Sequence, residues 1–208
     1  MYRIICLVIG YAVGCVQTAY IVGRLGAKID IREHGSGNAG TTNVVRVMGP
    51  QYGLLVFVFD VLKGILAFLI CALIFKGGSS FHSGAQGLIP GLYGGIGTVL
   101  GHDYPVQLKF KGGKGIATTV GIIFMTDFRI SIPVYLVAII AIALTRYISL
   151  GSLIIAGLFP ILLFTLGYDL ECVTLGIVLG ALAYYQHRGN IERLIKGNER
   201  KFNFKKQE

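Results

Sequence analysis

The sequence predicts an all-α integral membrane protein of about seven transmembrane helices, and composition and patterning both support this class. Hydrophobic residues make up 54% of the 208 residues and charged residues only 14%, whereas an ordinary soluble domain carries about 25% charged residues. The mean hydropathy is +0.70. Long apolar runs alternate with short loops that are rich in glycine and cations. We therefore expect one polytopic domain over residues 1–208.

The apolar runs define the expected spans. A bilayer core about 30 Å thick needs about 20 apolar residues in helical form, although a shielded helix can be shorter. Ile4–Gly23 is the first span, and its length and lack of a small-residue cleavage site favour a retained helix over a signal peptide. Tyr52–Phe75 is the second. The other five, of which Ile116–Thr126 and Cys172–Tyr185 are short for a crossing, are Ala85–Gly101, Ile116–Thr126, Ser131–Thr145, Leu150–Gly167 and Cys172–Tyr185.

Lysine and arginine predict how the chain crosses the membrane. If the N-terminus lies outside, fifteen of the 19 Lys and Arg residues fall on the side of the C-terminus, and only Arg3, Lys76 and Arg129 fall on the other. Such residues concentrate on the cytoplasmic side, so the C-terminus and the basic tail, residues 196–208, are predicted to be cytoplasmic. Five spans would place the termini in the same way, so the predicted orientation requires an odd number of spans and does not depend on the exact count. The fifteen cations are Arg24, Lys28, Arg32, Arg46, Lys109, Lys111, Lys114, Arg146, Arg188, Arg193, Lys196, Arg200, Lys201, Lys205 and Lys206.

The placement of these charges argues against nucleic acid as a partner. The net charge of +9 comes from the tail and from loops between apolar spans, where cations face anionic membrane lipids. The four cysteines lie in apolar segments without metal-type spacing, so neither a disulfide framework nor a metal site is expected. They are Cys6, Cys15, Cys71 and Cys172.

Three polar clusters interrupt the apolar pattern, and the predicted topology places all three at the cytoplasmic face. The first is Gly35-Ser-Gly-Asn-Ala-Gly-Thr-Thr-Asn-Val-Val-Arg46. Glycine at 35, 37 and 40 allows positive φ, so successive amide groups can surround an anion. Arg46 can hold phosphate through two parallel hydrogen bonds. A flexible turn between helices would use the same residue types, but the presence of two further cationic clusters favours an anion site.

The second cluster is Gly101-His-Asp-Tyr-Pro-Val-Gln-Leu-Lys-Phe-Lys-Gly-Gly-Lys-Gly115. Its Lys111-Gly-Gly-Lys114-Gly stretch lacks the earlier glycine and the following Ser or Thr of a nucleotide-binding P-loop. A glycine loop that opens a helix at Ile116, with Lys114 near the positive helix end, would still bind phosphate. The alternative is a basic loop that touches anionic lipid head groups.

The third cluster is Tyr185-Gln-His-Arg-Gly-Asn-Ile-Glu-Arg-Leu194. His187 and Asn190 share a helix face at i, i+3 spacing, which makes His187 a better candidate for substrate contact than His102, expected to shape its own loop. No H-x-x-x-x-D pair and no D-x-x-D-G motif occurs. This excludes the general-base arrangement of the coenzyme-A-dependent glycerolipid acyltransferases and the motif of enzymes that join CDP-activated lipids to alcohols.

Asp60 and Lys63 lie inside the second span at helical i, i+3 spacing. An ion pair within the membrane is costly and marks a candidate functional site, although it can also anchor a helix in its bundle. We favour the structural role, with Lys63 close enough to the polar face for an indirect effect on function.

Taken in order, the signatures G-S-G-N-x-G-x-T-N-x-x-R, G-H-x-x-P…F-K-G-G-K-G-x-A-T and H-R-x-N-I-x-R-L resemble those of the bacterial acyl-phosphate:glycerol-3-phosphate acyltransferases. The resemblance covers nearly the whole chain, because the hydrophobic spacing between the signatures also fits. It implies a seven-helix, multi-pass enzyme of the bacterial inner membrane. Such an enzyme moves a fatty acyl group from acyl phosphate to the sn-1 hydroxyl of glycerol 3-phosphate, giving lysophosphatidate and phosphate without a metal, coenzyme A or another cofactor.

The resemblance also implies roles for individual residues. Those expected to contact the phosphate or hydroxyls of glycerol 3-phosphate are Ser36, Arg46, Lys114, His187 and Asn190. Those expected to shape a polar hole for the acyl-phosphate head group are Gly37, Asn38, Gly40, Thr42 and Asn43. The candidate catalytic residues are Ser36, Lys114 and His187, and the predicted binding set is completed by Lys111, Gly112 and Gly113.

Two positions depart from the pattern that the resemblance implies. Gln186 stands where the third signature often has Arg, and Gln107 stands where an aromatic residue is usual. Both lie at the periphery of the expected site, so we expect them to change the affinity for substrate and not the reaction that is catalysed.

The chemistry implied by the resemblance is simple. An acyl phosphate is already activated, so positioning and charge stabilisation can supply most of the catalysis. The leaving phosphate oxygen can accept the proton of the attacking hydroxyl, as proposed for the family, and His187 would then orient substrate instead of removing a proton. The apolar spans would give the acyl chain a lateral entrance from the bilayer.

Two other classes of protein fit parts of the sequence. One is a small anion or lipid transporter with a phosphate site at the cytoplasmic face, but transporter sites tend to lie at mid-bilayer between inverted repeats, and no repeat is evident. The other is a non-catalytic lipid-binding scaffold, which would not need Ser36, Asn43 and Asn190 beside the cations.

Overall fold

The computed structural model describes residues 1–75 and 88–202, and every regular element in these ranges is helical. The predicted all-helical class is therefore confirmed for the described part of the chain. The elements are α1 (Tyr2–Gly14), α2 (Thr18–Val22), the π-helical turn η1 (Gly23–Ala27), the 3₁₀ turn η2 (Ile31–Glu33), α3 (Thr41–Met48), α4 (Pro50–Ile74), α5 (Leu88–Asp103), the 3₁₀ turn η3 (Val106–Leu108), α6 (Ile116–Phe124), α7 (Phe128–Thr145), α8 (Ile148–Thr165), α9 (Leu170–Gln186) and α10 (Arg188–Ile195).

Each of the seven predicted spans contains a helix, with boundaries that differ by a few residues. Among the described residues, α9 is apolar but short for a crossing, α5 has 16 residues and α6 has 9. Lys76 and residues 85–87 of the third predicted span lie outside the described residues, as do Lys205 and Lys206. The described helical stretches that are long and apolar enough to cross a membrane are Tyr2–Ala27, Pro50–Ile74, Phe128–Thr145 and Ile148–Thr165.

The first predicted span is a broken helix, which corrects the expectation of one continuous helix over Ile4–Gly23. The chain leaves the helical path after α1 and resumes it in α2. Buried side chains satisfy the carbonyls that the break frees: Lys63 Nζ donates to Val16 O over 2.9 Å, and the Gln17 amide donates to Gly14 O over 3.2 Å. Inside a membrane a freed backbone group needs such a partner, so α4, which carries Lys63, stabilises the break.

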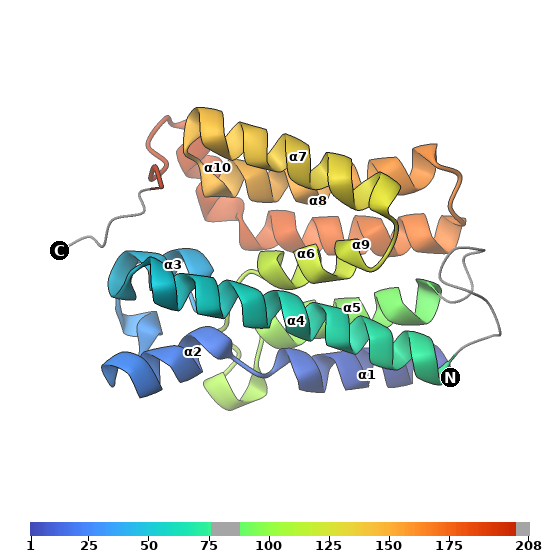
Figure 1. Ribbon diagram of the computed structural model, residues 1–208, viewed down its shortest axis with the longest axis horizontal. Coiled ribbons are helices and arrows are strands. Elements are labelled where there is room, and N and C mark those ends of the chain that lie inside the picture. The colour runs from blue at the N-terminus through green and yellow to red at the C-terminus, as the bar shows by residue number, and fades with distance from the viewer. Residues whose placement is uncertain (76–87, 203–208) are drawn as a thin grey trace.

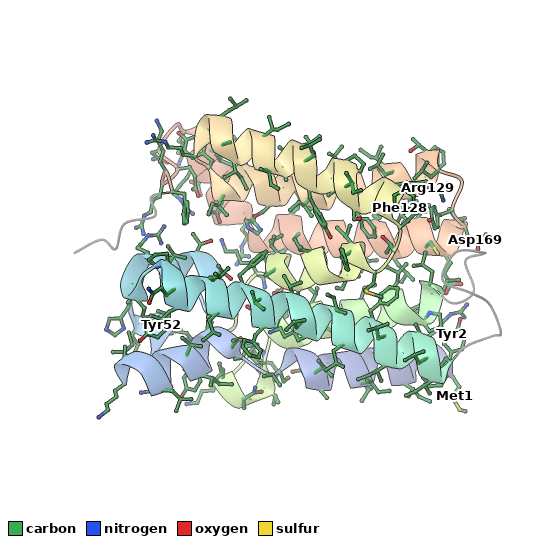
Figure 2. The ribbon with its side chains drawn as sticks, viewed as in Figure 1. Met1, Tyr2, Tyr52, Phe128, Arg129 and Asp169 are labelled. Atoms are coloured by element: carbon green, nitrogen blue, oxygen red, sulfur yellow. The ribbon has the colours of Figure 1, made fainter. Side chains whose placement is uncertain are left out.

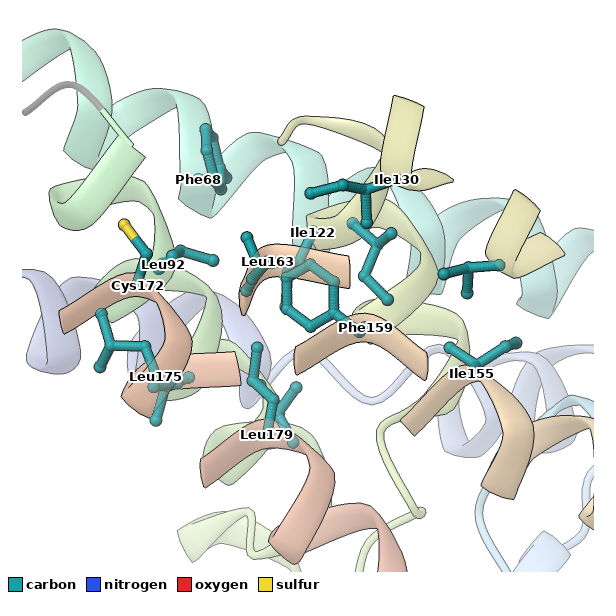
Figure 3. Close-up of a cluster of buried hydrophobic side chains, with 14 of the residues drawn as sticks. Phe68, Leu92, Ile122, Ile130, Ile155, Phe159, Leu163, Cys172, Leu175 and Leu179 are labelled. Carbon is teal, nitrogen blue, oxygen red and sulfur yellow. The ribbon is translucent and has the colours of Figure 1, made fainter. Parts of the chain in front are cut away.

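The helices form two layers (Figure 1). In the N-terminal layer α1, α4 and α6 pack around α5, and in the C-terminal layer α8 lies between α7 and α9. The layers meet where α5 packs on α9 and where α6 packs on α7 and α8. Their shared core is apolar, with Phe68, Leu92, Ile122 and Phe159 almost completely buried (Figure 3).

Glycine residues allow α1 and α5 to approach closely. A Cβ atom on Gly97 would overlap the carbonyl oxygen of Leu7, and one on Gly101 would overlap that of Tyr11. These glycines therefore serve helix packing, as the sequence predicts. The contact places the end of α5 directly against the break in the first span.

The two ends of the bundle differ in their chemistry. Tyr2 and Arg129 lie at one end, and Tyr52 lies toward the other (Figure 2). At the first end Arg3 donates two hydrogen bonds, of 2.8 and 2.9 Å, to the Glu171 carboxylate and so ties α1 to α9. The helices α3 and α10 lie at the opposite end (Figure 1). The first and third polar clusters therefore share one end of the bundle, as the sequence predicts.

Candidate active site

A cavity of ≈ 1280 Å³ collects residues from all three polar clusters. Its polar lining includes the predicted site residues Ser36, Gly37, Asn38, Gly40, Thr42, Asn43, Arg46, Lys114, His187 and Asn190. Its apolar lining comes mostly from α6, α7 and α8 and includes Phe57, Ile116, Val120, Tyr135, Ala138, Ile139, Ile142, Ile148 and Ile155. The cavity thus joins a cationic region to an apolar region.

Arg46 and Lys114 are partly buried cations of this cavity. Within the described ranges neither forms an ion pair with a carboxylate. Burial, together with the nearby charge of Arg200, lowers the pKa of the Arg46 guanidinium. Burial and then repulsion from Arg193 lower the pKa of Lys114 to about 8. These cations are incompletely compensated, and a bound phosphate would supply the missing negative charge.

The contacts of His187 determine its tautomer. Nδ1 lies 2.8 Å from the carbonyl oxygen of Ala183, and because a carbonyl only accepts, Nδ1 carries the proton and Nε2 can accept. The residue is buried and lines the cavity. Burial and then the charge of Lys114 lower the pKa of His187 to about 4. His187 is therefore neutral near pH 7 and suited to accept a hydrogen bond from a substrate hydroxyl.

The first glycine loop is held in shape by Asn43. Its Oδ1 accepts from the Ser36 amide over 2.7 Å, and its Nδ2 donates to two backbone carbonyls. Gly35 and Gly37 have φ of +63° and +75°, as predicted. Gly40 is extended, with φ of −148°, so the expectation of positive φ there was wrong. The reason is that Gly40 is the N-cap of α3, a position that takes β-region dihedrals.

The second glycine loop has two parts with different surroundings. Gly115 has φ of +68° and directly precedes α6, so Lys114 stands beside the N-terminus of that helix, as predicted. In the described part of the chain, the cavity is not lined by Lys111, Gly112 or Gly113. The amides of both glycines donate to carbonyls at the end of α5, and Lys111 is exposed. The observed role of the glycines is close packing, and substrate contact by these three residues stays a prediction.

The basic tail contributes a carboxylate that the sequence analysis did not place in the site. Glu199 accepts hydrogen bonds from Ser149, Asn190 and Arg193 over 3.0, 2.7 and 2.7 Å. Burial raises the pKa of Glu199, but these hydrogen bonds outweigh burial and the pKa lies below its ordinary value. Asn190 also accepts from the Lys114 ammonium, so Glu199 orients a predicted substrate ligand. The available signal in the sequence was an isolated carboxylate among the tail cations.

Other residues line the cavity without having been predicted as site residues. They include Thr41, Asp60, His102, Ser149, Ser152, Arg193, Arg200 and Phe202. Thr41 Oγ1 is fully buried and has no hydrogen-bond partner within the described ranges.

The fold and the cavity define a multi-pass integral membrane protein that can hold an anionic head group beside an apolar chain. The chain belongs to the glycerol-3-phosphate acyltransferase family, whose profile matches residues 4–197. This confirms the family that the three signatures indicate.

Relatives and solved structures cover almost the entire chain. A glycerol-3-phosphate acyltransferase of Thermoanaerobacter pseudethanolicus is 40% identical over 97% of this chain and 96% of its own length. One from Desulforudis audaxviator is 42% identical over 97% of this chain and 98% of its own length. The glycerol 3-phosphate form of PlsY, an integral membrane glycerol 3-phosphate acyltransferase, superposes with a TM-score of 0.85 at 35% identity, over 98% of this chain and 96% of that chain. Its lysophosphatidic acid form gives a TM-score of 0.83 at 35% identity, over 98% and 97%.

The lowered pKa of Lys114 predicts how activity depends on pH. An amine is charged below its pKa, so raising the pH through about 8 removes positive charge from the cavity. We expect kcat/KM for glycerol 3-phosphate to fall across this range, as measured by initial rates at fixed ionic strength. Lys114→Arg keeps its charge at these pH values and should lose the fall. The exposed control Lys201→Arg should keep it, and an unchanged profile in Lys114→Arg would assign the titration to another group.

Proposed function

We propose that this chain transfers a fatty acyl group from acyl phosphate to the sn-1 hydroxyl of glycerol 3-phosphate, releasing lysophosphatidate and phosphate as the first step of phospholipid synthesis. Arg46, Lys114 and Asn190 line the same cavity as apolar side chains of α7 and α8, and this arrangement supports the proposal most directly. Both substrates carry phosphate, and one also carries an acyl chain, so the two regions of the cavity match the two kinds of group. Family membership over residues 4–197 supports the same reaction.

The cations bind and orient the phosphates. Arg46 has a planar guanidinium suited to two parallel hydrogen bonds with phosphate oxygens, and Lys114 supplies a point charge beside the N-terminus of α6. The glycine loop, ordered by Asn43, offers its amide groups to the phosphates. Fixing both substrates in one cavity makes the attack effectively intramolecular.

The reaction needs no strong protein base. The sn-1 oxygen attacks the acyl carbonyl carbon, the carbon–oxygen bond to phosphate breaks, and the hydroxyl proton passes to an oxygen of the leaving phosphate. His187 accepts a hydrogen bond at Nε2 and so aims the hydroxyl. A pKa of about 4 makes His187 a poor proton acceptor near neutral pH, where an efficient general base has a pKa close to the working pH.

The distribution of charge supports a membrane arrangement for the chain. The proposed topology has seven crossings, the N-terminus outside and the C-terminus at the cytoplasmic face of a bacterial inner membrane. The concentration of cations near α3 and α10 supports it, because positive residues favour the cytoplasmic side. The cavity would then face the cytoplasm, where soluble glycerol 3-phosphate can reach it.

The donor is tested with purified protein in lipidic mesophase. The reaction contains labelled glycerol 3-phosphate and palmitoyl phosphate, and parallel reactions replace the donor with acyl-coenzyme A or acyl carrier protein. We expect lysophosphatidate from acyl phosphate alone. Product from either alternative donor but not from acyl phosphate would contradict the proposed reaction. Uptake of label into proteoliposomes without product would support a transporter instead.

The role of His187 is tested by two substitutions of different geometry. Gln can place a carbonyl acceptor near the position of Nε2 without useful basicity, whereas Asn retains the donor near Nδ1 and loses the acceptor. If His187 orients the hydroxyl, His187→Gln should keep kcat within about tenfold of the unsubstituted enzyme, and His187→Asn should lose more. Loss of a general base costs about 10² to 10⁴-fold. Equal losses of that size in both folded variants would show that His187 removes the proton.

A further inference from the structure

Three buried ionisable side chains lie at or next to the cavity, and the proposed reaction does not use them. Asp60 and Lys63 come from α4 and His102 comes from the end of α5. Their exposed fractions are 1%, 6% and 4%. Asp60 and His102 line the cavity together with the predicted site residues. A buried charged group needs partners for all its hydrogen-bonding atoms. The partners of Lys63 therefore show which nitrogen of His102 carries the ring proton.

Lys63 donates to three partners, one on α4, one on α5 and one in the segment between α1 and α2. Its Nζ lies 2.9 Å from Asp60 Oδ1, 2.9 Å from the carbonyl oxygen of Val16 and 2.7 Å from His102 Nδ1. A protonated ammonium has three protons, and these three partners account for all of them. The carbonyl of Gly14, at 3.5 Å, is a more distant neighbour.

This pairing fixes the tautomer of His102. An ammonium only donates, so His102 Nδ1 must accept, and the ring proton resides on Nε2. Asp60 Oδ1 lies farther from His102 Nδ1, at 3.8 Å, so the lysine and not the carboxylate determines the state of the ring. The charge of Asp60 is balanced by Lys63, and His102 is a neutral donor.

The Nε2 proton points to the glycine loops. A Cβ atom on Gly113 would overlap His102 Nε2 and would lie 2.9 Å from the carbonyl oxygen of Ala39. Ala39 stands between Asn38 and Gly40, in the loop predicted to surround the acyl-phosphate head group. Nε2 has no hydrogen-bond partner in the described part of the chain, and the atom is not completely enclosed by protein. Because His102 also lines the cavity, a bound ligand is the available acceptor.

We propose that His102 donates its Nε2 proton to an oxygen of the acyl-phosphate head group, and that Asp60 and Lys63 are positioning residues that hold His102 in this tautomer. This inference rests on the proposed function and adds a substrate contact to it. A neutral donor suits an oxygen on which negative charge is present or develops, because it stabilises that charge without holding product phosphate as tightly as a cation would.

The proposal is tested by substitutions that separate the two faces of the imidazole. His102→Asn can offer a carbonyl oxygen to Lys63 near the position of Nδ1 but removes the donor to the cavity. His102→Gln can retain a donor near Nε2. We expect kcat/KM for palmitoyl phosphate to fall about 10- to 100-fold in His102→Asn and less in His102→Gln. The KM for glycerol 3-phosphate should stay within about twofold, since the contact is made to the other substrate.

A contact between His102 and acyl phosphate should lower kcat/KM for palmitoyl phosphate and leave the KM for glycerol 3-phosphate nearly unchanged. A purely structural role would impair the use of both substrates. Equal defects toward both substrates, or an unchanged kcat/KM for palmitoyl phosphate in folded His102→Asn, would overturn the proposal. The unsubstituted enzyme provides the separate control for the reaction itself: if it makes no lysophosphatidate from palmitoyl phosphate, the proposed function fails before His102 is tested.

A measurement on the unsubstituted protein tests the tautomer directly. Histidine labelled with ¹⁵N gives four sites in this chain, and His102→Asn or His102→Gln assigns the relevant signals by their loss. We expect His102 to be protonated at Nε2 and His187, which donates from Nδ1 to Ala183, to show the opposite form. Nδ1 protonation of His102 would overturn the proposal. In the charge-balanced double variant Asp60→Asn with Lys63→Met, the loss of preference for the Nε2 form is the expected outcome, and full retention would contradict the role of the pair.

Discussion

The burial of one ammonium group constrains the arrangement of the N-terminal layer. Lys63 is 6% exposed and donates to the break after α1, to Asp60 on its own helix and to His102 at the end of α5. Breaking a buried ion pair leaves a charge whose cost is about 3–5 kcal/mol, so these partners must stay together. The end of α5 in turn accepts from the amides of Gly112 and Gly113. The ammonium group of Lys63 therefore constrains the break after α1, the position of His102 in the cavity wall and, through the end of α5, the second glycine loop.

The same constraint explains why irregular backbone can exist beside apolar helices. Polar backbone at membrane depth is tolerated where protein groups satisfy it or where it lines a cavity. Here Asn43, Lys63 and Gln17 satisfy the backbone around the cavity, and glycines let the loops approach α5 closely. The result is a fixed set of amides and cations next to apolar walls. Such preorganised groups stabilise charge without rearranging during the reaction.

Much of this arrangement was predictable from the sequence because it follows from local patterns. Each span predicted from hydropathy contains a helix, and glycine with polar residues identified the loops that reach the cavity. The break after Gly14 was not predictable, because its partner Lys63 is distant in the chain. The contribution of Glu199 depends on the tail folding back to Ser149, which composition does not reveal. A glycine can bind phosphate through its amide or allow close packing on a helix, and the sequence does not distinguish these roles. The packing of Gly112 and Gly113 against the end of α5 is visible only in the folded structure.

In the proposed reaction, Arg46, Lys114 and His187 bind glycerol 3-phosphate together within the cavity. The most direct test is a crystal structure of this protein with glycerol 3-phosphate, grown in lipidic mesophase. We expect phosphate oxygens within about 3 Å of the Arg46 and Lys114 nitrogens, at hydrogen-bond distance, with the sn-1 hydroxyl facing Nε2 of His187. Phosphate held instead by the exposed Lys109 and Lys111, with the cavity free of substrate, would contradict it.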